Sequence, residues 1–244
     1  METNNKDQKI CLHSELYFYL ITLIFVLCSY SISIEFFDDR IVGNGTSTLT
    51  TSIIISTFMI PMIFFFKKSN FSLSDFGFNL KNYKENIRSS IFISICFCAC
   101  LTLLKAILIR YSPLFANLTL FSRQVESIHF WMTTGIIYCA FAFLQAIMQN
   151  GFCQAPIYLL SKSPNKSLHS VLLSSLIFTF AHIDLSLAYA LATIPAGLLW
   201  AILFNKQKSL IGPYISHIII GIWSFWALNF EEIISLVSQS VQKL

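Results

Sequence analysis

The feature that most constrains this chain is a series of long apolar runs that carry almost no charge. A helix needs about 20 apolar residues to cross the hydrocarbon core of a bilayer, which is about 30 Å thick. Residues 130–161 contain no charged side chain, and six other runs reach or approach that length. Only 11% of the 244 residues are charged, where about 25% is usual in soluble domains. We therefore expect a chain that folds in lipid.

These runs predict an all-α fold, a polytopic transmembrane helical bundle of about seven spans, within a range of six to eight. The predicted spans are 16–34, 47–66, 89–109, 130–161, 170–183, 185–204 and 209–230. The fourth exceeds what one crossing needs, and Gly151 and Pro156 predict a bend near its end. The first span could instead be a signal peptide, but its apolar run is long for one, and an uncleaved helix is expected.

The same pattern divides the chain and orients it. Four parts are predicted: a cytoplasmic tail at 1–15, two transmembrane helices at 16–66, a transmembrane core at 67–230 and a C-terminal tail at 231–244. With the N-terminus inside, eleven of the 16 basic residues fall inside and five outside, which satisfies the positive-inside rule. We expect an integral protein of a bacterial cytoplasmic (inner) membrane. Lys105, near the outer end of its span, is expected to snorkel.

Composition also narrows the partners. No basic run is interleaved with aromatic residues, so nucleic acid is not an expected partner, whereas membrane lipids are. The seven cysteines are odd in number and six lie within predicted spans, which argues against a disulfide framework. Cys96, Cys98 and Cys100 have a metal-like spacing, but a helix does not place all three on one face, and packing explains them better.

Polar residues in the middle of predicted spans are the candidate functional groups, because hydrocarbon offers them no hydrogen-bond partner. They are Gln145, Gln149 and Asn150 in the fourth span, His182 at the end of the fifth and His217 in the seventh. At about 1.5 Å per residue, Gln145 and the two histidines lie roughly 12–22 Å into the bilayer. The three helices could therefore form one pocket. Alternatively, each histidine is neutral and hydrogen-bonded between helices.

The two histidines lie in recognisable motifs. One is Phe178-Thr-Phe-Ala-His182. The other begins at Gly197-Leu-Leu and leads through Ser209-Leu210 to His217, which lies 35 residues after His182. With the segment FSLSDFGFNL at 71–80, these motifs make residues 71–225 resemble the CPBP family. That family comprises CAAX proteases and bacteriocin-processing intramembrane endopeptidases, with Abi-like and bacteriocin-immunity members. The resemblance implies a CPBP-like transmembrane core at 67–230.

The chain departs from the family at four motif positions. The family carries Glu-Glu-x-x-x-Arg-Gly, but alignment on Gly151 puts Gln145 and Ala146 at the glutamates and Asn150 at the arginine. Gly221 stands where the motif beginning at His217 has asparagine. The resemblance implies that a glutamate activates water while the histidines position or polarise it. A glutamine amide cannot accept that proton, which removes a factor of about 10² to 10⁴ in rate. Loss of the asparagine removes about another 10².

No other carboxylate is an evident replacement. All seven glutamates lie at termini, in loops or at span ends. Asp184 is close to a motif, but it is two residues from His182 and would point to a different helix face. Two histidines without a carboxylate make a weak zinc site, so no cofactor is expected, and zinc is considered only for an active enzyme.

Three functions remain open from the sequence. The favoured one is a catalytically inactive homologue that binds a membrane protein or peptide partner in an immunity or regulatory role. The second is an active intramembrane endopeptidase with an altered mechanism, in which Asp184 or a bound ion replaces the glutamate. The third is a small transporter or lipid-binding protein that shares only the hydropathy. No inverted repeat is visible, which argues against a transporter.

Overall fold

The computed structural model describes residues 18–26, 28, 63, 66–67, 71–122, 128–183 and 185–241. In this part of the chain every regular element is helical, as predicted. The elements are α3 (Tyr83–Tyr111), η1 (Pro113–Phe115), α4 (Ile128–Ala146), η2 (Ile147–Gln154), α5 (Ala155–Leu160), α6 (Lys166–Phe180), α7 (Leu187–Gln207), α8 (Ile211–Ile222), η3 (Trp223–Ala227) and α9 (Phe230–Val241).

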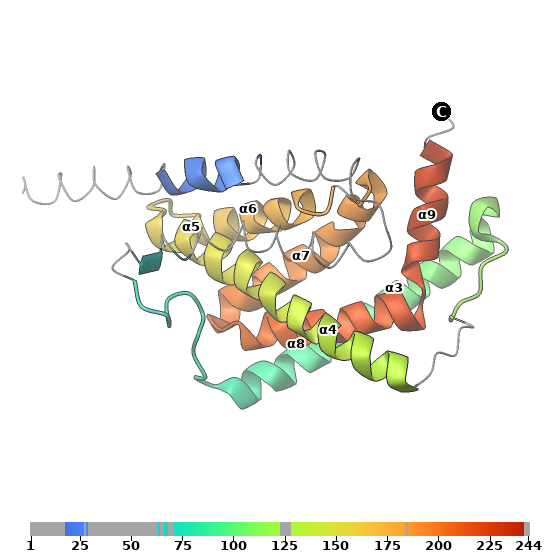
Figure 1. Cartoon of the computed structure of the whole chain (residues 1–244), viewed down its shortest axis with the longest axis horizontal. Coiled ribbons are helices and arrows are strands. Elements are labelled where there is room, and N and C mark those ends of the chain that lie inside the picture. Colours follow the sequence, from blue (N-terminus) through green and yellow to red (C-terminus); the bar gives the residue numbers. More distant parts are fainter. Residues whose placement is uncertain are drawn as a thin grey trace, which may run out of the picture.

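The helices pack by pairs around α7 and α8. Helix α6 packs on α7, α3 on α8, and α7 on α8, while α4 crosses α8 and η2 contacts α6 and α7. Figure 1 shows α4 passing across the bundle and α9 turning sharply away from the end of α8. The motif helices α4, α6, α7 and α8 are thus brought together although their residues span about 90 positions of the chain.

The distribution of polar and apolar side chains differs from that in a soluble protein, because polar side chains are buried beside the apolar core and many large apolar side chains are exposed. Buried side chains include serines, amides and a lysine, whereas large apolar side chains point outward from α3, α4 and α6. Ser94 Oγ of α3 donates to the carbonyl oxygen of Ser90 and lies 2.8 Å from Ser216 Oγ of α8, from which it accepts, a polar contact between closely packed helices. Apolar side chains on the outside suit a surface that faces lipid, and this pattern indicates an integral membrane protein.

By length and composition, three segments of the described chain can cross a membrane. They are Tyr83–Tyr111, Met132–Leu160 and Leu187–Gln207, and Ile211–Ala227 with Phe230–Val241 makes a fourth if this pair, bent by 70°, is one broken span. Helix α6 has only 15 residues. The predicted span at 47–66 lies almost wholly outside the described residues, and the one at 16–34 is described only at 18–26 and 28, where it is helical. A seven-span bundle therefore remains a prediction, while the helical fold is confirmed.

The long uncharged run at 130–161 is one nearly continuous helix with a wide turn inside it. The bend expected near Gly151 is a π-helical segment, η2, between α4 and α5. Gly151 allows a close approach there, because a Cβ on it would lie 3.2 Å from the carbonyl oxygen of Phe76, a tight contact. The loop at 71–82 thus packs directly on the helix backbone, with Phe76 completely buried.

Lys105 does not snorkel as predicted. Its side chain is fully buried, and its Nζ donates to the carbonyl oxygen of Leu228, where η3 ends and the chain turns into α9. Asn229, the next residue, has a positive φ of 46°. Its position in the sequence predicts that Lys105 reaches the membrane interface, but in the structure it binds a backbone oxygen at a helix break.

Candidate functional site

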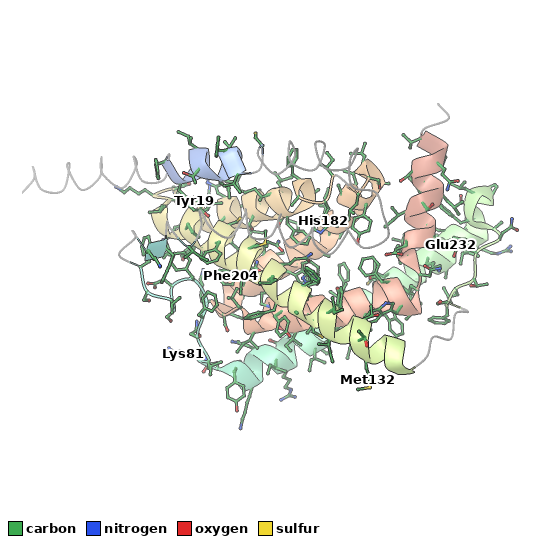
Figure 2. The ribbon with its side chains drawn as sticks, viewed as in Figure 1. Tyr19, Lys81, Met132, His182, Phe204 and Glu232 are labelled. Atoms are coloured by element: carbon green, nitrogen blue, oxygen red, sulfur yellow. The ribbon has the colours of Figure 1, made fainter. Side chains whose placement is uncertain are left out.

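A cavity of about 180 Å³ lies among α3, α4, α7, α8, η3 and the turn after α6. Figure 2 shows His182 between Lys81 toward one end of the molecule and Glu232 toward the other, and its side chain is half-buried. Side chains able to form hydrogen bonds line the cavity: Tyr138, Gln145, His182, Tyr189, Thr193, Trp200, His217 and Ser224. The rest of the wall is mainly apolar and aromatic.

His182 is oriented by its own helix and by α7. Its Nδ1 lies 2.7 Å from the carbonyl oxygen of Phe178, one turn earlier. Because a carbonyl oxygen only accepts, Nδ1 carries the proton and Nε2 is the basic nitrogen of the ring. The ring also stacks on Tyr189, with 6.0 Å between centroids and 10° between planes.

His217 is held by aromatic rings. It is buried in the middle of α8, and its ring stacks on Trp200 of α7 at 3.8 Å and 12°. Phe178 contacts His217 edge-on at 6.2 Å, so one phenylalanine touches both histidines. Trp200 Nε1 is a buried donor without a hydrogen-bond partner among the described residues. Among the described residues, Trp200 is the only tryptophan that lines the cavity.

Four of the six predicted site residues line this one cavity: Gln145, His182, His217 and Gly221. These residues come from α4, the turn after α6, and α8, so three separate segments meet at one cavity. Ala146 and Asn150 are buried elsewhere in the helix packing.

The amides after Gln145 bind the neighbouring helix. Gln149 Nε2 donates to the carbonyl oxygen of Gly197 at 2.8 Å, and Gln154 Nε2 to that of Ala201 at 2.8 Å. Asn150 Nδ2 donates to Gln154 Oε1 at 3.0 Å, and Asn150 Oδ1 has no hydrogen-bond partner in the described structure. The residue at the family's arginine position therefore belongs to a structural amide chain that joins η2 to α7.

Tyr138 fills the space left by the missing asparagine. A Cβ on Gly221 would lie 1.5 Å from Tyr138 Oη, so the phenol occupies the volume into which a side chain at 221 would project. Tyr138 Oη also donates to the carbonyl oxygen of His217 at 3.3 Å. Tyr138 was not among the site residues expected from the sequence. Tyr138 lies seven residues before Gln145, which is two helical turns along the same face, and this spacing could have indicated that it shares the site.

No carboxylate lines the histidine cavity among the described residues. Asp184 lies outside them. Glu231 of α9 lines a neighbouring cavity of about 270 Å³, which shares four residues with the histidine cavity. In the described structure no three histidine, cysteine or acidic side chains form a group that could hold a metal. Two histidines alone do not fit zinc, for which at least three protein ligands are usual.

Comparison with known families supports the motif reading. The family model described as type II CAAX prenyl endopeptidase Rce1-like matches residues 135–223. This segment contains all six predicted site residues and Tyr138. The resemblance to the CPBP family is thereby confirmed over that segment. No curated protein and no solved structure matches the chain significantly.

Proposed function

We propose that this CAAX-protease-like membrane protein binds an apolar peptide segment of a membrane partner in its histidine cavity without cleaving it. The observation that carries the proposal is the chemistry of the cavity wall. Gln145 stands at a motif glutamate, and the described wall holds no carboxylate. A neutral amide does not accept a proton from water near neutral pH, so the retained histidines have no strong base to work with.

The lining also favours binding. Apolar side chains such as Leu101, Ile220 and Ile234 surround a few polar groups, which is the usual composition of a site for an apolar ligand with one or two polar atoms. A peptide carbonyl within a membrane segment would accept from the Trp200 indole N–H, which has no hydrogen-bond partner among the described residues. An immunity or regulatory protein needs this kind of recognition and no turnover.

A second function has one specific observation in its favour. Glu231 lines the neighbouring cavity together with Tyr138, Tyr189, Gly221 and Phe225, which also line the histidine cavity. A water held where these two cavities meet could transfer its proton to Glu231 instead of the missing motif glutamate. This arrangement would support an active endopeptidase with an altered base, using a carboxylate that the sequence analysis assigned to a span end.

A cleavage assay with a prenylated CAAX peptide tests both readings in the purified full chain. Under the binding proposal, wild type is inert and Gln145→Glu gains cleavage, because it places a carboxylate directly on the cavity wall. The gain should disappear with His182→Ala and persist with His169→Ala, which removes an exposed histidine of α6. Cleavage by wild type would contradict the proposal.

If wild type cleaves the peptide, Glu231→Gln tests the altered base and Glu232→Gln is its matched control. Both carboxylates are exposed on α9, but Glu231 lines the neighbouring cavity. Loss of activity in Glu231→Gln alone would establish the altered base. If neither wild type nor Gln145→Glu cuts, peptide binding decides. Under the binding proposal the peptide raises the melting temperature of wild type, and the rise is lost in His217→Leu.

A further inference from the structure

A second cavity, of about 340 Å³, lies away from the histidines, where α5 and α7 end and α3 and α6 begin. Its volume is within the range of about 300–1,000 Å³ typical of small-ligand sites. Lys81 and Phe204, which both line it, lie toward the same end of the molecule in Figure 2, far from Glu232. Its wall is rich in amides, hydroxyls and ammonium groups.

Two lysines share one aromatic ring at this cavity. Lys208 Nζ lies 3.5 Å from the ring centroid of Tyr158, and Lys166 Nζ lies 4.5 Å from the same centroid. Burial, and then the charge of Lys166, lower the pKa of Lys208. Lys81 adds a further positive charge to the wall. In the described structure no carboxylate lies within ion-pair distance of these three ammonium groups, so positive charge is concentrated here without a close counter-charge.

One acidic side chain does line the cavity. Asp75 Oδ2 accepts from the backbone N–H and from the hydroxyl of Ser72, both at 2.8 Å. Its charge is thus engaged in the turn at 72–75. With Lys81 and Lys208 on the wall and Lys166 beside it, the cavity remains net positive.

The backbone presents Lys208 in an unusual way. Lys208 ends α7 with a positive φ of 50°, and Asn82, on the same cavity wall, has a φ of 55°. Glycine is the usual residue at such a helix end, and lysine is unfavourable in this conformation. The conformation is held by the 71–82 loop. Asn79 Nδ2 donates to the Lys208 carbonyl oxygen at 2.6 Å, and Ser209 Oγ donates to the Asn79 carbonyl oxygen at 3.0 Å.

This loop contains the segment at 71–80 that the family resemblance singled out and that the histidine cavity does not use. Unfavourable backbone conformations that the surrounding structure enforces are concentrated at ligand sites. Here they fix two polar residues on one wall. Asn205 Oδ1 accepts from Lys208 Nζ at 3.2 Å and so helps to position that ammonium group on the wall. Two ammonium groups beside the Asn82 amide are the usual chemistry of a phosphate site.

We infer that this cavity binds a phosphate group between Lys81 and Lys208, carried by an anionic phospholipid headgroup or by a free phosphate. The two sources share the same chemistry. The lipid source agrees with the location, since the segments Met132–Leu160 and Leu187–Gln207 both end here, and lysines at span ends attract anionic lipids.

Lipid binding by the purified full chain in neutral detergent tests this inference. The probes are dioleoylphosphatidylglycerol, dioleoylphosphatidylcholine as the uncharged-headgroup control, and inorganic phosphate. Binding is measured by native mass spectrometry and by the shift in melting temperature. The test variant is Lys208→Asn with Lys81→Gln, because asparagine tolerates a positive φ. The matched control is Lys206→Asn with Lys84→Gln, which removes two exposed lysines that do not line the cavity.

We expect wild type and the control variant to bind phosphatidylglycerol and the test variant to bind it about thirtyfold more weakly. Stabilisation by phosphatidylglycerol alone identifies a lipid headgroup, and stabilisation by inorganic phosphate alone identifies a soluble phosphate. Either result supports the inference if the test variant loses it. Equal binding of both phospholipids with no effect of phosphate, or equal anion binding by both double variants, would overturn it. The melting temperature without ligand shows that the test variant is folded.

Discussion

Gly221 has no side chain, and this absence determines which polar group lines the histidine cavity at that point. Tyr138 from α4 reaches into this space, with its hydroxyl 1.5 Å from where a Cβ would be. An asparagine at 221 and a tyrosine at 138 therefore exclude one another. The pair explains how a motif position can be lost while the cavity still offers a hydrogen-bond donor near His217.

We expect Gly221→Ala to destabilise the protein by about 1–3 kcal/mol, because the Tyr138 ring must move out of a packed site. The measurement is thermal unfolding in detergent. Gly135→Ala is the control on α4, since a Cβ there meets nothing within 4 Å and alanine favours a helix over glycine by about 0.5–1 kcal/mol. Adding Tyr138→Ala should abolish the further cost of Gly221→Ala. A cost that persists without Tyr138 would refute this account.

The residue scale also shows how much of the site the sequence predicted. Gln145, His182 and His217 were assigned to one layer from depth alone, and they line one cavity. Hydropathy gives the depth of a residue but not the rotation of its helix. For this reason it could not separate Gln145, on the cavity wall, from Asn150, which bonds to Gln154. Tyr138 was missed because its role depends on what Gly221 lacks, which only packing reveals.

Among the elements, η2 joins the first motif to α7 through amides. Gln154 Nε2 binds the Ala201 carbonyl oxygen, while its Oε1 accepts from Asn150. We expect Gln154→Leu to destabilise the protein by about 1–3 kcal/mol, since the buried Asn150 amide loses its acceptor. The double variant Gln154→Leu with Asn150→Leu should recover most of the loss, because it removes both partners. Additive losses in thermal unfolding would show that the two amides act independently.

The break between η3 and α9 depends on a buried lysine of α3. Lys105 Nζ donates to the Leu228 carbonyl oxygen, and α9 carries Phe230 and Ile234, which line the histidine cavity. Lys105→Met should cost about 1.5–3 kcal/mol, the usual value of a hydrogen bond to a charged group. It should also accelerate amide hydrogen exchange in α9. Arg110→Met, which removes an exposed charge of the same helix, is the control. Equal exchange in both variants would contradict this role.

Helix ends were harder to predict than helices. The run at 130–161 was recognised, but hydropathy does not show its π-helical segment or the close approach of Phe76 to Gly151, a contact between distant parts of the chain. The run at 209–230 was predicted as one span, yet the chain turns by 70° after Ala227. Hydropathy could not reveal that turn, because Lys105, which binds it, comes from another helix.

At the scale of the whole molecule, the two cavities lie apart along the long axis. The lysine-rich cavity is at the end where α7 closes, and the histidine cavity lies in the interior, toward α9. The Asn79–Lys208 hydrogen bond joins the start of α3 to the end of α7. We therefore expect both ends to face the same side of the membrane, and Arg110, in the last turn of the 29-residue α3, to face the other.

Cysteine labelling tests this arrangement and the orientation expected from the positive-inside rule. In a chain whose seven native cysteines are replaced, Lys81→Cys and Lys206→Cys should react with an impermeant maleimide only in inside-out vesicles of a bacterial host. Because the loops that carry Lys81 and Lys206 are rich in basic residues, which are retained inside, Arg110→Cys at the opposite end of α3 should react in intact cells. If each cysteine reacts in the other preparation instead, the predicted orientation is wrong and must be inverted, but the fold is not contradicted. Separation of positions 81 and 206 to different sides would refute the packing of the 71–82 loop on the end of α7, because one hydrogen bond joins these two segments.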